Sequence, residues 1–251
     1  MDKLLIALDV ESAAKAVTLA DQLRGIAGGF KIGSRLFTSE GPSIVRALRE
    51  KGDRVFLDLK FHDIPNTVAQ AVAAATTLGV WMVNVHASGG VRMMEAARDA
   101  ARETAAGHGT TPPLVIAVTV LTSMNARALE ETGQGSRPAP RVDLPTYAGV
   151  ETVVLEQVVR LAQLARTAGL DGVVASAQET AAIRRECGPD FAIVTPGIRA
   201  GGPDRAAKDD QERTMTASQA IAAGATYIVV GRPIIAAADP RAAAELLIVD
   251  C

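Results

Sequence analysis

The stretch Val55-Phe-Leu-Asp-Leu-Lys-Phe-His-Asp-Ile-Pro-Asn-Thr67 opens as an apolar strand and ends as the start of a helix. Side chains alternate faces along a strand, so Asp58 and Lys60 are predicted to point the same way. Two opposite charges on one face of an apolar strand favour the end of a buried strand, where they meet a ligand. Asp63 follows in the loop, and Pro65 suits the first turn of the next helix. The alternative for this D-x-K-x-x-D pattern is a structural ion pair followed by an aspartate helix cap.

The same order of a strand followed by a helix recurs along the chain. Apolar runs predicted as strands occupy residues 4–9, 28–33, 54–60, 80–86, 114–121, 172–176, 191–195 and 226–231. Helical spacing of apolar residues predicts helices over residues 12–23, 41–51, 68–78, 91–106, 150–168, 177–186, 216–223 and 241–249. A polar stretch over residues 125–147 is predicted as a short helix plus an excursion, and residues 200–213 as a mobile loop.

Eight such units in 251 residues, with no linker between two halves, predict a single α/β domain over residues 1–251. Alternating strands and helices favour a parallel sheet, and eight units favour a closed (β/α)8 TIM barrel. An open doubly wound sheet is the alternative. No G-x-G-x-x-G motif follows the first strand, which disfavours the dinucleotide-binding form of that sheet.

Composition argues against several kinds of partner. The net charge is −2, so no basic field favours nucleic acid or a membrane surface, and only 3% of residues are aromatic. The apolar segment of residues 221–238 is interrupted by Gly231, Arg232 and Pro233, so it is not predicted to span a membrane. Cys187 and Cys251 lie in no C-x-x-C pair and are interpreted as free thiols, with a disulfide between them as the alternative. With no secretory signal at the start of the sequence, these features predict a cytoplasmic protein.

Polar residues stand at nearly every predicted strand end. In a (β/α)8 barrel the carboxyl ends of the strands carry the active site. Reading these ends in order gives Asp9, Lys31, Asp58 with Lys60, His86, Thr122 with Ser123, Ser176, Arg199, and Gly231 with Arg232. A barrel without a site would not need this pattern, so it predicts an active site on one rim.

Lys31 lies within an apolar strand, between Phe30 and Ile32. If these neighbours face the helices, Lys31 faces the inside of the barrel. A charge there needs anionic partners, because an isolated buried charge is very costly. Asp58 on the adjacent strand is the expected partner, and a surface lysine with an extended stem is the alternative.

The string DLKFHDIPNT resembles the active-site segment of the orotidine 5′-monophosphate decarboxylases, and the resemblance continues in order along the whole chain. It implies decarboxylation of orotidine 5′-monophosphate (OMP) to UMP and CO2, the last step of de novo UMP biosynthesis, without metal or cofactor. It also implies that Lys31, Asp58, Lys60 and Asp63 form the catalytic array, with Lys60 as proton donor. In that family the second aspartate comes from the partner subunit of a homodimer, which implies that Asp63 serves the neighbouring site.

The loops after the last two strands are the expected phosphate site. Barrels often bind phosphate there, and arginine forks and glycine amides suit phosphate oxygens. The strings GIR and VVGRPI resemble the family's phosphate-binding segments, which implies that Arg199, Gln211, Gly231 and Arg232 contact the nucleotide. The alternative for Arg232 is a solvated arginine at a helix start.

Further substrate contacts follow from the same resemblance. The LTS triplet resembles the segment that contacts the pyrimidine, which assigns Thr122, and the LDV triplet assigns Asp9 to the ribose. Lys31 and Thr67 complete the implied substrate-binding set. Helix capping by Thr122 and a strand-end cap by Asp9 are the alternatives.

Two other functions remain open from the sequence. Related barrels with a D-x-K-x-x-D motif use Mg²⁺ to decarboxylate or cleave sugar phosphates, but they carry an acidic metal ligand near the end of the second strand. Here that region holds Lys31, which would repel a metal ion. A catalytically silent nucleotide-binding barrel is the second alternative. His62, His86 and His108 lack metal-ligand spacing, so no metal site and no histidine base is predicted.

Overall fold

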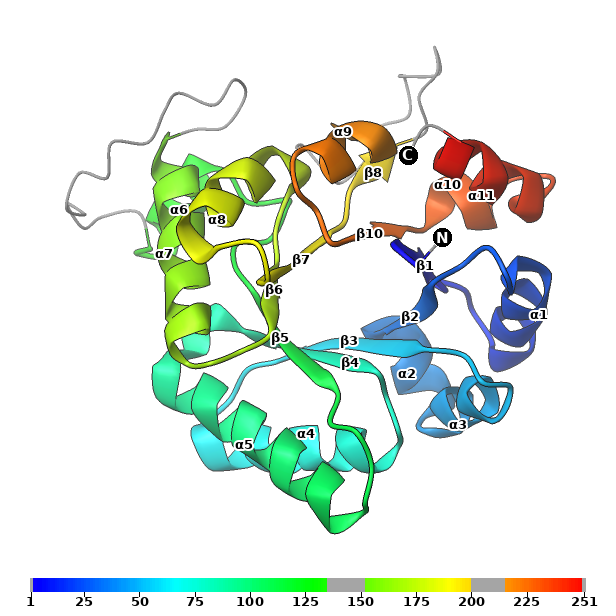
Figure 1. Cartoon of the computed structure of the whole chain (residues 1–251), viewed down its shortest axis with the longest axis horizontal. Coiled ribbons are helices and arrows are strands. Elements are labelled where there is room, and N and C mark those ends of the chain that lie inside the picture. Colours follow the sequence, from blue (N-terminus) through cyan, green and yellow to red (C-terminus); the bar gives the residue numbers. More distant parts are fainter. Residues whose placement is uncertain (1, 135–151, 200–214, 250–251) are drawn as a thin grey trace.

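Eight parallel strands form a closed barrel in the computed structural model, which describes residues 2–134, 152–199 and 215–249 (Figure 1). In order around the barrel the strands are β1 (Leu4–Ala7), β10 (Tyr227–Val230), β7 (Ala192–Thr195), β6 (Gly172–Val174), β5 (Leu114–Val118), β4 (Met82–His86), β3 (Val55–Phe61) and β2 (Gly29–Gly33). The ring closes through parallel pairing of β1 with both β2 and β10. The predicted (β/α)8 barrel is confirmed, and the open sheet is excluded.

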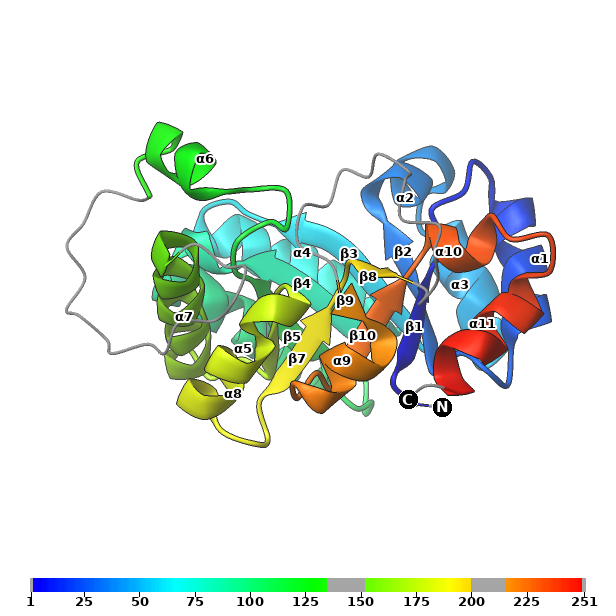
Figure 2. The same cartoon turned by 90° about the horizontal axis from the view of Figure 1, so that it is seen from above.

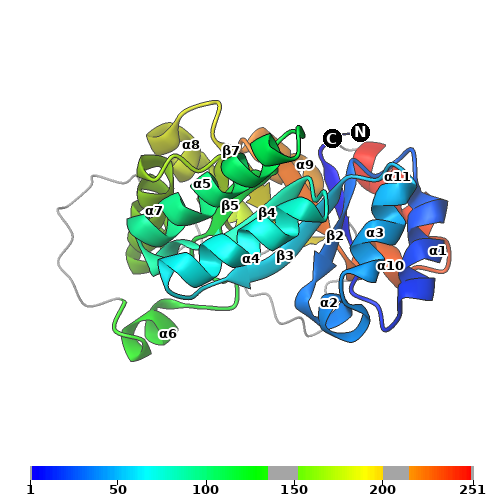
Figure 3. The same ribbon diagram turned by 90° about the horizontal axis from the view of Figure 1, so that it is seen from below.

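Helices surround this ring of strands (Figure 1). They are α1 (Ala13–Leu23), α3 (Ser43–Glu50), α4 (Pro65–Thr77), α5 (Val91–Gly107), α7 (Thr152–Thr167), α8 (Thr180–Cys187), α9 (Ala217–Ala222) and α11 (Pro240–Val249). Each overlaps a helix predicted from apolar spacing. The helices α4 and α5 lie side by side along the strands β3 and β4 (Figure 3).

Several short helices, turns and strands lie outside the eight barrel strands and the surrounding helices. They are α2 (Ser34–Glu40), α6 (Ala126–Glu131), α10 (Arg232–Ile235), the 3-10 turns η1 (Ala87–Gly89) and η2 (Ala177–Glu179), and the paired strands β8 (Ile198–Arg199) and β9 (Met215–Thr216). Figure 2 shows α2 and α6 projecting at the barrel end that the strands reach with their carboxyl ends. The sequence predicted α6, and η2 lies at the start of the helix predicted over residues 177–186. The other short elements were not predicted, because so few residues carry too few apolar positions to define a period.

Local capping explains where two helices begin. Ser12 accepts a hydrogen bond from the backbone N–H of Lys15 at 3.4 Å and starts α1. Thr216 and Gln219 form a capping box, in which each side chain accepts from the other residue's backbone N–H, and this starts α9. Such caps satisfy N–H groups that the first helical turn leaves without partners.

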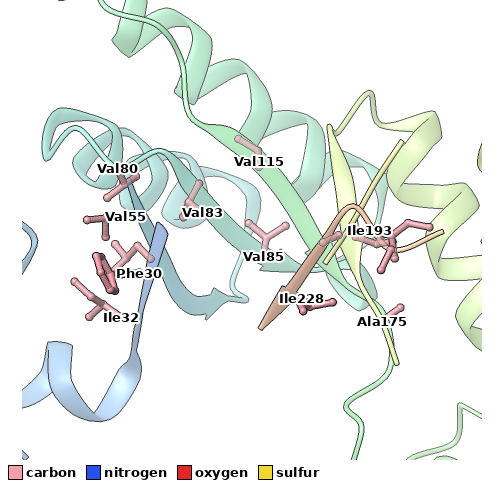
Figure 4. Packing of buried hydrophobic residues seen from close by; sticks show 14 of the residues in the cluster. Phe30, Ile32, Val55, Val80, Val83, Val85, Val115, Ala175, Ile193 and Ile228 are labelled. Carbon is pink, nitrogen blue, oxygen red and sulfur yellow. The ribbon is translucent and has the colours of Figure 1, made fainter. Parts of the chain in front are cut away.

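The core consists of two apolar layers, one on each face of the strands. The larger layer lies between strands and helices, and Figure 4 shows Val55, Val83 and Val115 of this layer on neighbouring strands. The smaller layer fills the inside of the barrel and consists of Leu5, Ala7, Phe56, Met82, Ile116, Val194 and Val229. Phe56 is 2% exposed, and burial of such a side chain contributes about 2–3 kcal/mol. Because these side chains fill the inside of the barrel, a site is expected at a barrel end.

Two predicted segments lie outside the described residues. They are most of the excursion after α6, residues 135–151, and the predicted loop over residues 200–214. That all 251 residues form one catalytic domain therefore stays a prediction. Along the described ranges, no helix is both long enough and apolar enough to cross a membrane.

Candidate active site

A cavity of about 280 Å³ opens at the carboxyl ends of the barrel strands. Seven of the residues predicted for the site line it: Asp9, Lys31, Asp58, Lys60, Thr122, Gly231 and Arg232. They come from the neighbouring strands β10, β1, β2 and β3 or their ends, and, in the case of Thr122, from the segment after β5. Distant parts of the sequence therefore meet in one cavity, as the polar strand ends predicted.

Four of these side chains form a continuous chain of charges. The Lys31 ammonium lies 3.1 Å from Asp9 Oδ1 and 3.4 Å from Asp58 Oδ2. The Lys60 ammonium donates to Asp58 Oδ1 at 2.6 Å. Lys31 is only 8% exposed, so the surface-lysine interpretation is wrong and the predicted pairing with Asp58 is confirmed. Negative and positive side chains alternate in this row of four, and their mutual attraction offsets the cost of burying Lys31 and Asp58.

Lys60 reaches Asp58 through an irregular backbone and not through the regular alternation that was predicted. Leu57 pairs with Val83 of β4, but the next paired residue of β3 is Phe61, opposite Val85. Four residue steps on β3 thus face two steps on β4, which defines a bulge. Within it Lys60 has φ 53°, the one positive value at a non-glycine residue in the described ranges. Bulges of this kind re-aim a side chain.

Asn84 belongs to this network, and the sequence analysis missed it. Its Nδ2 donates to Asp58 Oδ1 at 2.7 Å, and its Oδ1 accepts from the backbone N–H of Lys60 at 2.8 Å. The signal was present, since an asparagine stands in the middle of the apolar strand β4, between Val83 and Val85. It could not be interpreted without knowing that β4 lies beside β3.

The Asp58 carboxyl is held in its ionised form. Burial by itself raises its pKa, but the charges of Lys31 and Lys60 and the hydrogen bonds from Lys60 and Asn84 act against burial. The net result is a pKa below the ordinary aspartate value. A carboxylate is therefore present beside Lys60 throughout the neutral pH range.

This lowered pKa predicts how stability depends on pH. A depressed native pKa stabilises the fold above the unfolded-state pKa, near 4, and that contribution is lost as the pH falls through the native pKa. We expect Asp58→Asn to lose about 3 kcal/mol at pH 7, because it leaves the buried Lys31 and the half-buried Lys60 short of a partner. The difference from wild type should shrink as the pH falls below about 4.

Urea unfolding from pH 3 to pH 7 measures this difference. The exposed Asp99, which pairs with the adjacent Arg98, offers the control Asp99→Asn, for which we expect a much smaller change. A difference between wild type and Asp58→Asn that stayed constant down to pH 3 would contradict the interpretation.

An apolar wall completes the cavity opposite the charges. It is made by Val118, Val120, Leu121, Val174, Val194 and Ile198. None of these was predicted as a site residue, because apolar residues at strand ends look like ordinary core. The wall gives the cavity a charged side and an apolar side, which suits a flat ring that carries a charged substituent.

Asp63 and Thr67 do not line this cavity. The Asp63 carboxylate accepts from the backbone N–H of Ile64 at 2.6 Å and borders a separate recess with His62 and Pro65. Thr67 is exposed on α4, and Ile64 is 66% exposed. Within one chain, therefore, the predicted catalytic array is brought together only in part.

The remaining strand-end residues have other surroundings. Ser176 is fully buried and forms a capping box with Glu179 at the start of η2, so its role is structural. The ring of His86 lies 5.5 Å from that of His62 and outside the cavity lining. The pKa of His86 is lowered, mainly by burial and to a smaller extent by the nearby His62 and Lys60. The backbone of Arg199 lies in β8, while its side chain and all of Gln211 lie outside the described residues.

The donor groups of the cavity do not resemble a metal site. Across residues 2–134, 152–199 and 215–249, no three His, Cys, Asp or Glu side chains gather closely enough to hold a metal ion. Asp9 and Asp58 are the acids of the cavity that the structure describes, and Lys31 lies between them.

Comparisons with known proteins agree with this geometry. The sequence matches the family model described as "Orotidine 5'-phosphate decarboxylase / HUMPS family" over residues 2–247. Orotidine 5'-phosphate decarboxylases of Moorella thermoacetica and Syntrophotalea carbinolica are both 52% identical over 246 residues, covering 98% of this chain and 90% and 93% of theirs.

Solved structures give the same result for the fold. Orotidine 5'-phosphate decarboxylase from Lactobacillus acidophilus superimposes with a TM-score of 0.79 at 33% identity, covering 99% of this chain and 98% of that one. An uncharacterized conserved protein from Geobacillus kaustophilus gives the same TM-score at 38% identity, covering 98% and 99%. With its barrel, its charged rim cavity and these relatives, the chain belongs to the orotidine 5'-phosphate decarboxylase / HUMPS family.

Proposed function

We propose that this protein decarboxylates OMP to UMP and CO2, the last step of de novo UMP biosynthesis. The observation that carries the proposal is the ammonium of Lys60, held 2.6 Å from the buried Asp58 at the rim of the barrel. The relatives at 52% identity, which are named as orotidine 5'-phosphate decarboxylases, support the same reaction.

Decarboxylation at C6 requires a positively charged group, fixed beside C6, that can also donate a proton. Breaking the bond between C6 of the orotate ring and its carboxylate releases CO2 and leaves the electron pair on C6. The Lys60 ammonium stabilises this negative charge, then transfers a proton to C6 and becomes a neutral amine, which solvent reprotonates. Asp58 keeps Lys60 in place, and Lys31 balances the charge of Asp58.

The rest of the substrate fits the other cavity residues. Gly231 and Arg232 stand after β10 and suit the phosphate, together with Arg199 and Gln211, which rest on the sequence resemblance alone. Thr122 suits a polar group of the pyrimidine, and Asp9 with Lys31 suits the ribose hydroxyls. Binding energy from the phosphate, remote from C6, then serves to organise the reacting centre.

The proposed reaction needs neither metal nor cofactor. Lys31 lies between Asp9 and Asp58, so a cation already occupies the position between these carboxylates. A divalent ion placed there would be repelled by the lysine. This observation favours the metal-free reaction over a Mg²⁺-dependent sugar-phosphate lyase of the same family.

We further propose a homodimer in which Asp63 and Thr67 complete the neighbouring subunit's site. The supporting observations are that both residues lie outside the cavity of their own chain and that Ile64, between them, is 66% exposed. A cytoplasmic location also stays a proposal. The buried free thiol of Cys187 agrees with a reducing compartment.

The test is a spectrophotometric assay of the purified protein with OMP in excess EDTA. We expect the orotate absorbance to decay at a rate that EDTA does not change. Turnover of a ketose phosphate that requires added Mg²⁺, with no turnover of OMP, would assign the protein to the metal-dependent branch. Tight UMP binding without turnover of either substrate would indicate a silent nucleotide-binding barrel.

A further inference from the structure

The amide of Asn84 bridges the two residues on which the proposed reaction depends. Asn84 is fully buried on β4, and its side chain points into the barrel, on the same strand face as Met82. One end of the amide meets the Asp58 carboxylate at 2.7 Å, and the other meets the backbone N–H of Lys60 at 2.8 Å. Asn84 itself does not line the cavity.

The orientation of this amide follows from the chemistry of its partners. A backbone N–H can only donate, so it must meet the amide oxygen. An ionised carboxylate can only accept, so it must meet the amide nitrogen. Asparagine offers one acceptor and one donor on a short stem, and both contacts are of good length.

The position of Asn84 explains why the bulge in β3 is stable. Asn84 lies between Val83 and Val85, which pair with the residues on either side of the bulge. There the side chain of Asn84 supplies the acceptor that a backbone carbonyl supplies in a regular ladder. Lys60 adopts φ 53°, which bulky residues rarely adopt, and such a conformation persists where the surroundings hold it.

We infer that Asn84 is a positioning residue: its amide holds Lys60 in the left-handed conformation and orients Asp58, so that the Lys60 ammonium is presented to the reacting carbon. The inference rests on the proposed function for its catalytic part. Asn84 does not line the cavity, so its loss should affect turnover more than binding.

The first test is Asn84→Ala. We expect kcat to fall about 100-fold, the order of loss that a misplacement of about 1 Å produces, while the dissociation constant for UMP stays within about threefold. The control is Gln157→Ala, which removes another buried amide, hydrogen-bonded to Arg160 on α7 and outside the cavity. This control should leave kcat within about twofold.

The second test is Asn84→Asp, which keeps the acceptor for the Lys60 N–H but sets a second carboxylate against Asp58. The replaced amide nitrogen lies 2.7 Å from Asp58 Oδ1, so the new carboxyl group would lie in contact with Asp58. Two carboxylates this close raise the pKa of one of them, so the pair retains one proton at acidic pH. The introduced carboxyl group, when protonated, would donate to Asp58 and restore both contacts of the amide. We therefore expect activity within about tenfold of wild type at low pH, falling about tenfold per pH unit above the apparent pKa of the pair.

The charged and titratable groups around this position are Lys60 on the same strand as Asp58, Lys31 on β2, Asp9 after β1 and His86 on β4. All of them are present in wild type and in Asn84→Ala as well. A decline at high pH confined to Asn84→Asp therefore reports the new pair of carboxylates. A residue with only a structural role would give no such pH signature.

Three results would overturn the inference while the wild type decarboxylates OMP. They are a kcat within threefold of wild type for Asn84→Ala, parallel losses of kcat and UMP binding, and a pH profile of Asn84→Asp that matches wild type. If the wild type does not turn over OMP, the proposed function fails instead. In that case a crystal structure of Asn84→Ala decides: a Lys60 φ that leaves the left-handed region supports the positioning role, and an unchanged φ overturns it.

Discussion

Lys60→Ala is expected to lower kcat for OMP by at least about 10⁴-fold, because the lysine combines two roles in the proposed reaction. Proton transfer by a positioned acid contributes about 10²- to 10⁴-fold, and one preorganised electrostatic contact contributes about 10²- to 10³-fold. The residues proposed to bind the phosphate, the ribose and the ring are unchanged in this variant. UMP should therefore still bind with a dissociation constant within about tenfold of wild type.

The substitution is well suited to the test because of the backbone at this position. At φ 53° alanine suffers the same steric strain as lysine, so the variant removes the ammonium without adding backbone strain. The decay of orotate absorbance measures kcat, and calorimetric titration with UMP measures binding. In D2O the wild-type product should carry deuterium at C6, since the ammonium exchanges its protons with solvent.

Lys51→Ala is the matched control. The Lys51 ammonium lies 2.8 Å from Asp21, so this control also removes a lysine that is paired with an aspartate, but at the surface. Its kcat should match wild type. If Lys60→Ala kept more than a tenth of the wild-type kcat, Lys60 could not be the proton donor, and the mechanism proposed here would be wrong.

The fold could be predicted because each strand–helix unit carries its own signal. Apolar runs such as residues 226–231 and helical spacing such as residues 91–106 do not depend on what lies beside them. The cavity followed from the fold, since parallel strands in a barrel end on the same rim. Lys31 could be paired with Asp58 because neighbouring strands in the sequence are also neighbours in the barrel.

What could not be predicted depends on contacts across strands. The bulge in β3 arises from a register difference between β3 and β4, and neither strand shows that difference alone. The interpretation by simple alternation therefore reached the right pair, Asp58 and Lys60, for the wrong reason. Asn84 was missed for the same cause, because an asparagine in a strand acquires its meaning only from the residues opposite it.

Asp63 does not line the cavity of its own chain, so its proposed catalytic role requires the site of a second subunit. We expect Asp63→Ala to lower kcat at least about 100-fold, since the carboxylate would help to hold Lys60 in the neighbouring site. A subunit-mixing experiment then tests whether the residue acts across the dimer. The two parents, Lys60→Ala and Asp63→Ala, should each be nearly inactive as homodimers.

Exchange of subunits between equal amounts of these parents should restore activity. In a dimer that carries one subunit of each kind, one site combines an intact Lys60 with an intact Asp63 from the other subunit, and the second site lacks both. Random exchange makes half of the dimers mixed, so activity should recover to about a quarter of wild type.

If Asp63 acted within its own chain, every site in the mixed dimer would lack one residue, and activity would not recover. Mixing each parent with the double variant Lys60→Ala/Asp63→Ala is the control, because no arrangement of those subunits contains an intact site. Recovery in the first mixture alone would establish both the dimer and the crossing of Asp63. No recovery, despite subunit exchange shown by differently tagged chains, would remove Asp63 from the neighbouring site and leave Asp58 as the carboxylate that holds Lys60.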